Sequence, residues 1–153
     1  RGASGIDGLI STAIGMSIDN KSFNALIIGD VSFCYDLSSL NIAKDIPISL
    51  NIFIINNQGG HIFDRLDGLK TQEKSNYEKY WLTPPELDIK SLSKAFGCNY
   101  YYVGPNRYIK IANIINNIDL KDRKINLIEI TVDPIKHKLN NLKIEEKIRK
   151  ALN

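Results

Sequence analysis

The chain has 153 residues, of which 43% are hydrophobic and 24% are charged, as in an ordinary globular domain. Its net charge is only +3, and the basic residues are scattered along the chain, which argues against a nucleic-acid-binding surface. The apolar run 48–55 is far shorter than the roughly 20 residues that span a bilayer, so we expect no membrane span. Cys34 and Cys98 lie far apart and outside any Cys/His array, which argues against a zinc site or a disulfide framework and favours a reducing compartment.

The amino-terminal segment predicts a buried helix. Ser4 followed three residues later by Asp7 is a variant of the N-cap pattern, and apolar residues recur at helical spacing from Ile6 to Ile14. The chain opens on this motif at Arg1 without a charged and then apolar leader. We therefore expect it to be the carboxyl-terminal part of a longer protein.

The next segments predict two strands joined by a helix. The apolar run 25–28, closed by Gly29-Asp30, is typical of a central strand of a parallel sheet that is covered on both faces. A loop over 30–32 and a helix over 33–43 follow, ended by the break at Pro47. The run 48–55 predicts a second buried strand.

The remainder alternates between helices and strands after one long irregular segment. Residues 56–87 lose all periodicity, and long ordered loops are usually functional. Helices are then expected over 88–96, from 105 to 118 and over 138–152, with strands over 100–103 and 125–132. This order predicts an α/β fold with a doubly wound, mainly parallel sheet and helices on both faces. In such sheets the ligand crevice lies beyond the carboxyl ends of the strands.

Polar residues follow both of the first two predicted strands. Asp30 and Asn57 are separated by 27 residues, an interval that one β-helix-β unit fits. If the two strands are neighbours, a carboxylate, an amide and loop carbonyls converge at one edge of the sheet, and these are ligands that Mg²⁺ prefers. Because Mg²⁺ usually completes its shell with phosphates and water, the pattern predicts a bound diphosphate, assisted by a helix amino terminus near Ser32.

This pattern resembles the signature of thiamine-diphosphate enzymes, in which Gly-Asp is followed at this interval by Asn-Asn. Val31 stands where the general signature has a third glycine. The strings 1–13, 29–37 and 56–63, with Thr83-Pro84 ahead of Leu87-Asp88, are similar to the 2-succinyl-5-enolpyruvyl-6-hydroxy-3-cyclohexene-1-carboxylate synthases of menaquinone and phylloquinone synthesis. The resemblance implies a thiamine-diphosphate-binding fold, with 1–153 as one carboxyl-terminal domain whose amino-terminal domains precede it.

The resemblance also assigns site residues. It implies Asp30 and Asn57 as side-chain ligands and Gly59 as the backbone ligand of Mg²⁺, with Mn²⁺ as an alternative. It implies that Ile6 props the cofactor into its bent shape and that the Gly5 carbonyl holds the cofactor's amino group. The implied cofactor-binding set is Ser4, Gly5, Ile6, Gly29, Asp30, Val31, Ser32, Asn57, Gly59, Gly60 and Ile62. The implied substrate-binding set is Arg1, Ile62, Phe63 and Leu66, in which the arginine suits a carboxylate.

The implied reaction is decarboxylation of 2-oxoglutarate and conjugate addition of the succinyl carbanion to isochorismate. In such enzymes an activating glutamate comes from the pyrimidine-binding domain of the neighbouring subunit, and no glutamate here has that context. We therefore expect a homodimer or a dimer of dimers, and a chain that is inactive alone. The implied compartment is the bacterial cytoplasm or the plastid stroma.

Other interpretations stay open at this point. Asp30 alone could be a helix cap, Gly59-Gly60 a tight turn, and Ile62 with Phe63 part of the core. His61 is left outside the catalytic set, because lone histidines are more often structural. The rival functions are another thiamine-diphosphate enzyme, such as an acetohydroxyacid synthase or a 2-oxoacid decarboxylase, and a non-catalytic diphosphate-binding module. The presence of both Asp30 and Asn57 counts against the non-catalytic module.

Overall fold

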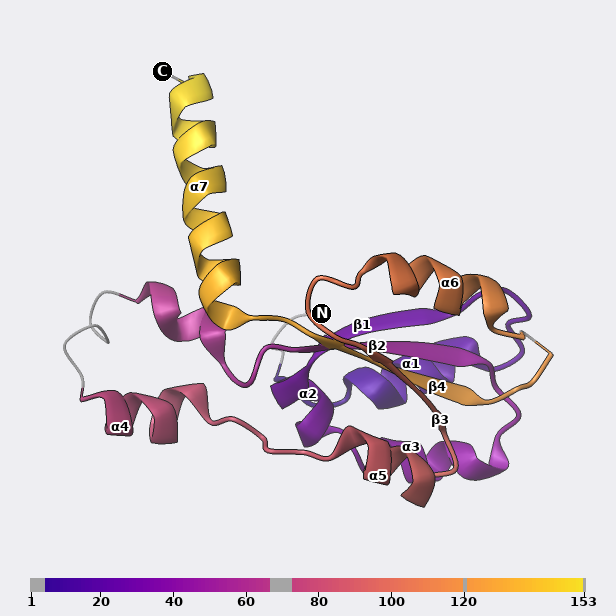
Figure 1. Cartoon of the computed structure of the whole chain (residues 1–153). Helices are drawn as coiled ribbons and strands as arrows, with labels where there is room; N and C mark the ends of the chain where they lie inside the picture. Colours follow the sequence, from indigo (N-terminus) through magenta and orange to yellow (C-terminus); the bar gives the residue numbers. More distant parts are fainter. Residues whose placement is uncertain (1–4, 67–72, 120, 153) are drawn as a thin grey trace.

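A computed structural model describes residues 5–66, 73–119 and 121–152, which fold into a parallel sheet with helices on both faces (Figure 1). The sheet has the order β1-β2-β4-β3, and each neighbouring pair is parallel. The strands are β1 (Ala25–Gly29), β2 (Leu50–Asn56), β3 (Asn99–Val103) and β4 (Ile125–Thr131). The helices and helical turns are α1 (Leu9–Ser17), α2 (Asp30–Tyr35), α3 (Ser39–Ile42), η1 (Ala43–Asp45), η2 (His61–Arg65), α4 (Lys74–Tyr77), η4 (Glu78–Leu82), α5 (Ile89–Ala95), α6 (Ile109–Asn117) and α7 (Pro134–Leu152).

Two apolar clusters lie on opposite faces of the sheet. The larger cluster packs α1, α2, α3 and α5 against alternate strand residues such as Ile52 and Leu127. The smaller cluster packs Ile111 and Ile114 of α6 against Phe53 and its neighbours on the other face. Figure 1 shows α6 on one side of the strands, with α3 and α5 on the other. The predicted doubly wound α/β fold is therefore confirmed.

The prediction that the first strand is central and covered on both faces is wrong for the described residues. β1 lies at the edge of the sheet and pairs with β2. Its central residue Ile27 is 74% exposed, because the apolar cluster under α6 is built from residues of β2, β3 and β4 and does not include β1. An apolar strand residue of this kind is a surface that a neighbouring element could cover.

The predicted loop over 30–32 and helix over 33–43 are also wrong. Helix α2 begins directly at Asp30, the chain turns at Asp36, and α3 and η1 follow as separate short elements. The turn is stabilised by the Asp36 carboxylate, which accepts hydrogen bonds from the backbone N–H groups of Ile10 (2.5 Å) and Ser11 (3.1 Å) and from the Ser39 hydroxyl (2.7 Å). Asp36 therefore caps α1 from a distant part of the chain.

Three helix boundaries differ from the prediction because of local backbone chemistry. Helix α1 begins at Leu9, after Gly8 in a left-handed conformation (φ 68°), instead of near Ser4. Helix α6 begins at Ile109, after a turn. Helix α7 begins at Pro134, where a proline needs no N–H partner, and the Asp133 carboxylate accepts from the next two amides (3.0 and 3.1 Å).

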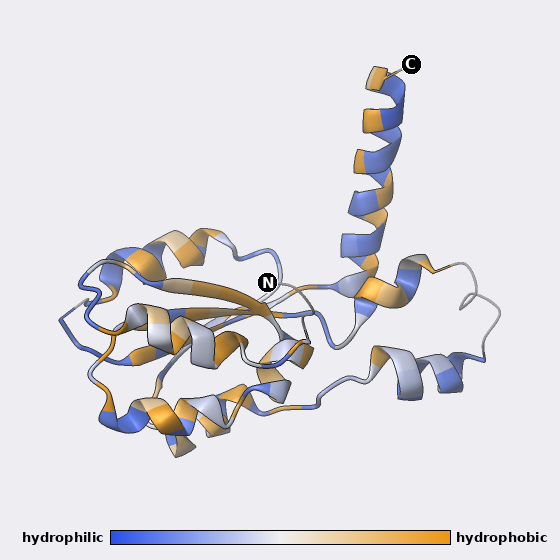
Figure 2. Ribbon diagram, turned by 180° about the vertical axis from the view of Figure 1, so that it is seen from behind, coloured by the Kyte–Doolittle hydropathy of each residue, from blue (hydrophilic) through white to orange (hydrophobic). Residues whose placement is uncertain are grey.

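Helix α7 projects away from the sheet (Figure 2), so its apolar residues lie largely exposed along the ribbon. No helix within 5–66, 73–119 or 121–152 is long and apolar enough to cross a membrane. The expected irregular stretch 56–87 contains the helical turns η2, α4 and η4, while 67–72 lie outside the described residues.

The Asp36 cap predicts a pH-dependent loss of stability. Burial raises the pKa of Asp36, but the hydrogen bonds from Ser39, Ser11 and Ile10 outweigh it, so the net pKa is lowered. Replacing Asp36 with Ala should lower the free energy of unfolding at pH 7 by about 1–3 kcal/mol. Because the folded-state pKa is depressed, the electrostatic part of this stabilisation is present above the unfolded pKa of about 4 and is lost as the pH falls through the folded value.

Denaturant unfolding at pH 7 and pH 3 measures this effect. The control is Asp122→Ala, which removes an exposed ion pair with Lys124 (3.4 Å) and should cost less than about 1 kcal/mol. If Asp36→Ala lowered the free energy of unfolding equally at both pH values, the charge of the carboxylate would not contribute to stability.

Candidate functional site

The ends of β1 and β2 meet at one edge of the sheet. Gly29 is in register with Ile55, so the residues that follow the two strands emerge side by side. Asp30 is 3% exposed, and its Oδ2 accepts a hydrogen bond from the backbone N–H of Gly59 (2.8 Å). The structure therefore brings together residues that are 29 positions apart in the sequence.

Asn57 completes this cluster. With its amide oriented to satisfy its neighbours, Asn57 Nδ2 donates to the Gly59 carbonyl (3.1 Å) and to Asp30 Oδ1 (3.2 Å). The predicted metal ligands Asp30, Asn57 and Gly59 are thus in direct contact with one another. The Asn57 NH₂ group thus lies between the Gly59 carbonyl oxygen and Asp30 Oδ1. A cation in its place would contact the same two oxygens, and rotation of the Asn57 amide by 180° would add its own oxygen as a third ligand.

The donor set fits a hard divalent cation. A carboxylate, a side-chain amide and a backbone carbonyl are oxygen ligands of the type that Mg²⁺ takes alongside phosphates and water. Within the described ranges, no three His, Cys, Asp or Glu side chains are grouped in a way that could hold a metal ion. The cluster therefore fits Mg²⁺ or Mn²⁺ better than it fits a zinc site.

The electrostatics of Asp30 agree with this donor set. Burial raises the pKa of Asp30, and hydrogen bonds from the Gly59, Val31 and Gln58 amides offset only part of the effect. Among the described side chains, which do not include that of Arg65, no Lys or Arg forms an ion pair with this carboxylate. A buried carboxylate without a cationic partner is stabilised when a cation binds beside it.

The glycine pair after Asn57 is required by a close backbone approach. Gly59 has a φ of 124°, and a Cβ at this position would overlap the Leu82 carbonyl oxygen. A Cβ on Gly60 would lie 2.8 Å from the Trp81 carbonyl oxygen, and the Gly60 N–H donates to the Leu82 carbonyl (2.6 Å). The turn η4 is therefore packed directly against the loop that carries the candidate ligands.

The apolar residues of the predicted substrate-binding set, Ile62, Phe63 and Leu66, lie on and beside η2. We call these three residues the substrate wall. Ile62 is 80% exposed and Leu66 is 49% exposed, while Phe63 packs edge-on against Trp81 with 5.5 Å between ring centroids. Ile62 lines a cavity of about 720 Å³ together with Asn57 and residues of α7. Phe63 is thus anchored, whereas Ile62 is available to contact a bound molecule.

A hydrogen-bonded group links η2 to α4. His61 Nδ1 lies 3.1 Å from Asp64 Oδ2, and the Tyr77 hydroxyl donates to Asp64 Oδ1. Burial and the Asp64 carboxylate raise the pKa of Tyr77 to about 12. Burial also raises the pKa of Asp64, but the hydrogen bonds from Tyr77 and His61 outweigh it and lower the pKa overall. His61 therefore has a structural partner, and its Nε2 is the nitrogen left for a further contact.

A second network supports the strand end behind the site. Glu129 accepts hydrogen bonds from Asn56 Nδ2 (2.7 Å) and from the Tyr100 hydroxyl (2.6 Å). Burial, with the Glu129 carboxylate, raises the pKa of Tyr100. Of the two consecutive asparagines, Asn56 is thus held by β4, which leaves Asn57 facing the site.

Sequence reasoning missed Asp64, Tyr77 and Glu129. Glu129 is the one charged residue in the largely apolar segment 125–131, and this is the signal that could have indicated it. The link between Asp64 and Tyr77 crosses 67–72 and leaves no periodic trace. Both residues become visible once the fold places them together.

The remaining predicted residues are less closely grouped. Val31 and Ser32 lie in the first turn of α2, and the Val31 N–H donates to Asp30 Oδ1 (2.9 Å). Gly5 and Ile6 precede α1, and Ile6 is 44% exposed. Arg1 and Ser4 lie outside the described residues.

Comparisons with known proteins identify the family to which the chain belongs. Residues 5–130 match the family model "Thiamine pyrophosphate enzyme, C-terminal TPP binding domain". The chain is 40% identical over 100 residues to the 2-succinyl-5-enolpyruvyl-6-hydroxy-3-cyclohexene-1-carboxylate synthase of Bacillus velezensis, covering 65% of this chain and 17% of that protein. It is 38% identical over 132 residues to the synthase of the same name from Pasteurella multocida, covering 86% and 22%.

Two further matches extend the comparison. The chain is 36% identical over 124 residues to "Protein PHYLLO, chloroplastic" of Arabidopsis thaliana, covering 80% of this chain and 7% of that protein. The solved structure of benzoylformate decarboxylase from Polynucleobacter necessarius matches with a TM-score of 0.63 at 17% identity, covering 82% of this chain and 23% of that one. The chain spans about a fifth or less of the length of these curated relatives. Its matched sequence and its fold show that it belongs to the thiamine pyrophosphate enzymes, as a C-terminal TPP-binding domain similar to that of the 2-succinyl-5-enolpyruvyl-6-hydroxy-3-cyclohexene-1-carboxylate synthases.

Proposed function

We propose that this chain supplies the diphosphate and metal half of the active site of a synthase that decarboxylates 2-oxoglutarate and adds the succinyl group to isochorismate, in menaquinone or phylloquinone synthesis. The observation that carries the proposal is the contact among Asp30, Asn57 and Gly59 at the carboxyl ends of β1 and β2. The identity to proteins named as this synthase supports the choice of reaction. When bound, thiamine diphosphate supplies the electron sink for loss of CO₂.

The chain's own residues then hold the cofactor and neutralise its charge. Asp30, Asn57 and the Gly59 carbonyl would hold Mg²⁺ or Mn²⁺, which would neutralise charge on the diphosphate. Ser32 donates to a diphosphate oxygen from the first turn of α2. Gly29, Val31 and Gly60 supply backbone that allows the diphosphate to approach closely. Ser4, Gly5 and Ile6 contact the cofactor from the segment before α1.

The substrate wall orients the reactants and excludes water. Ile62 and Leu66 present exposed apolar side chains, and Phe63 is held by its edge contact with Trp81. An apolar wall strengthens the electrostatic contacts made inside it because it displaces water. Arg1 binds a substrate carboxylate through its planar guanidinium.

We also propose that the chain acts as one domain of a longer enzyme. Ile27 is exposed on the edge strand β1, and in the longer enzyme another part of the protein would cover it. The activating glutamate would come from the amino-terminal domain of a second subunit in a homodimer or dimer of dimers, so the isolated chain would be inactive. The relatives include bacterial proteins and a chloroplastic protein, which supports the bacterial cytoplasm or the plastid stroma as the compartment.

The test of the reaction uses the full-length protein that contains this segment. Isochorismate loss and CO₂ release are followed in the presence of thiamine diphosphate, Mg²⁺, 2-oxoglutarate and isochorismate, and with each component left out in turn. Turnover that requires all four supports the proposal. Decarboxylation of 2-oxoglutarate without loss of isochorismate would point to another thiamine-diphosphate enzyme, and a protein that binds no cofactor would be a non-catalytic module.

Replacing Asp30 with Asn separates metal binding from stability. Loss of the carboxylate should weaken Mg²⁺-dependent cofactor binding by roughly 100-fold or more, since even indirect partners of metal ligands contribute 10–100-fold. Because burial raises the folded-state pKa of Asp30, its ionised form costs stability at pH 7 and this cost vanishes as the pH falls below the unfolded pKa. Asn offers only one acceptor oxygen for the Gly59 and Val31 N–H groups, so the variant loses a hydrogen bond as well as the buried charge. Because these two changes oppose each other, the metal-free variant should unfold close to the temperature of the metal-free parent.

Cofactor titration and thermal unfolding of the full-length protein, each with and without Mg²⁺, measure the two effects. The control is Asp119→Asn, which keeps an acceptor for the Lys121 N–H (2.8 Å) on an exposed turn and should change neither. Unchanged cofactor binding by the Asp30 variant would refute the metal assignment.

Replacing Tyr77 with Phe tests the link between α4 and η2. The variant loses the hydroxyl that donates to Asp64, which should loosen the segment that carries Ile62 and Phe63. We expect kcat/KM for isochorismate to fall roughly five- to tenfold, which corresponds to about 1–1.4 kcal/mol and to the net contribution of one ordinary hydrogen bond, with cofactor affinity within about twofold of the parent.

Steady-state kinetics and cofactor titration distinguish this effect from general damage. Tyr80→Phe is the matched control, because Tyr80 lies on the adjacent turn and the Lys79 contact with its ring (5.1 Å) needs no hydroxyl. A parallel loss of cofactor affinity in Tyr77→Phe would mean that the hydroxyl supports the whole site and not the substrate wall alone.

A further inference from the structure

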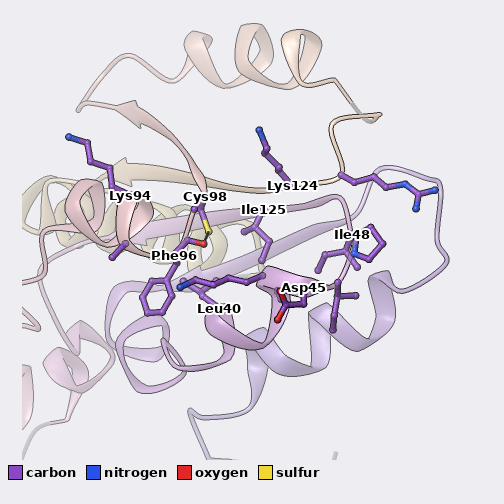
Figure 3. A pocket seen from close by; sticks show the side chains of 15 residues that line it. Leu40, Asp45, Ile48, Lys94, Phe96, Cys98, Lys124 and Ile125 are labelled. Carbon is purple, nitrogen blue, oxygen red and sulfur yellow. Dashed lines mark hydrogen bonds between the residues drawn. The ribbon is translucent and has the colours of Figure 1, made fainter.

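A second cavity lies at the opposite end of the sheet from Asp30 and Asn57. Figure 3 shows the side chains that line it. We call it the basal cavity; its volume is about 700 Å³. It is bounded by η1 and the connection into β2, by the end of α5 and the turn into β3, and by the residues that enter β4. All three strands meet it at their amino ends, whereas the candidate metal ligands follow carboxyl ends, so the two sites are separated by the length of the sheet.

The base of the basal cavity is formed by apolar side chains, whereas its rim is polar. Leu40, Ile48 and Ile125 are buried at its base, and the Phe96 ring and the Cys98 side chain complete the wall. Burial raises the pKa of the Cys98 thiol to about 11, so this group is uncharged at neutral pH. The base of the cavity therefore offers packing surface and carries no charge of its own.

The rim of the basal cavity is basic. Four cationic side chains and one carboxylate line the rim. The carboxylate belongs to Asp45, and the cations belong to Lys44, Lys94, Arg123 and Lys124. Lys124 pairs with Asp122 outside the cavity (3.4 Å), and the Lys44 amine lies 5.5 Å from the centre of the Phe96 ring. Over the described residues, Lys44, Lys94 and Arg123 form no ion pair with a carboxylate. These long, exposed side chains are free to close over a bound anion.

The helix end at the cavity does not favour a cation instead. The carboxyl end of a helix carries partial negative charge, but the last carbonyls of α5 are already used. The N–H groups of Phe96, Gly97 and Cys98 donate to the Leu92, Lys94 and Ser93 carbonyls at 3.0, 3.2 and 2.8 Å. The carbonyls of Leu92, Ser93 and Lys94 therefore already have donors, and the unpaired rim cations outnumber the one rim carboxylate, Asp45.

We propose that the basal cavity binds a small organic anion, with its carboxylate, sulfonate or phosphate group among Lys44, Lys94 and Arg123 and its apolar part against Phe96. A cavity of about 700 Å³ is much larger than an inorganic oxyanion needs, and its apolar wall contributes binding energy only to a ligand with an organic body. This site is independent of the diphosphate site and does not require the proposed reaction.

The test is a fluorescence titration of the full-length protein with 8-anilinonaphthalene-1-sulfonate, an anion with an apolar ring system. Saturating thiamine diphosphate and Mg²⁺ are present, so that the diphosphate site is filled. The double variant Lys94→Glu, Arg123→Glu reverses the rim charge, and Lys110→Glu, Lys147→Glu makes the same change in charge at exposed positions on α6 and α7.

We expect saturable dye binding by the parent, roughly tenfold weaker binding by the rim variant, and binding within about twofold of the parent by the control, since each exposed charge contact contributes up to about 1 kcal/mol. Added salt should weaken binding by the parent and the control more than by the rim variant. Cofactor affinity should be unchanged in both variants, which checks that they are folded.

Two results would overturn the proposal. One is equal dye binding by the rim variant and the control, and the other is the absence of saturable binding by the parent, as would follow if another part of the full-length protein covered the cavity. If charge reversal impairs folding, Lys94→Gln with Arg123→Gln removes the charge without reversing it and should weaken binding roughly threefold. Unchanged binding by that variant would contradict the proposal equally.

Discussion

The site depends on one buried hydrogen bond, from the Gly59 N–H to the Asp30 carboxylate. It joins the first residue after β1 to the loop after β2, and the parallel register of these strands makes the distance short. Burial raises the pKa of Asp30, which means that the folded protein disfavours the ionised form of the carboxylate that accepts this bond. The same carboxylate is therefore both the structural link between two strand ends and the group that gains most from a bound cation.

The loop beyond this bond is fixed by contacts from a later part of the chain. Gly59 and Gly60 have no room for a Cβ because the backbone at Trp81 and Leu82 lies against them. The Phe63 ring on Trp81 and the Tyr77 hydroxyl on Asp64 add two side-chain contacts across the same interface. Ile62 is thus exposed on a segment held at both ends, and an exposed apolar residue in a fixed position is suited to binding.

Local patterns in the sequence predicted the alternation of helices and strands and the convergence of Asp30 with Asn57, because runs of apolar residues and chain turns are local properties. The break at Asp36 could not be predicted, since that carboxylate is used by amides 25 and 26 residues away. Asn51 and Asn126 are polar residues within buried strands, and the Asn126 amide donates a hydrogen bond to Asn51 Oδ1 (2.8 Å), a pairing that a local pattern cannot reveal. The exposure of Ile27 was missed because an apolar run in the sequence does not reveal whether a neighbouring element covers it.

The two ends of the sheet have opposite electrostatic requirements. Among the described side chains, no Lys or Arg forms an ion pair with the buried carboxylate at the carboxyl ends of the strands, and no carboxylate forms one with Lys44, Lys94 or Arg123 at the amino ends. Neither group can compensate the other, because the strands hold them apart and exposed charges are screened over about 8 Å at physiological salt. The two proposals therefore call for separate ligands of opposite charge, a cation beside Asp30 and an anion at the basal cavity.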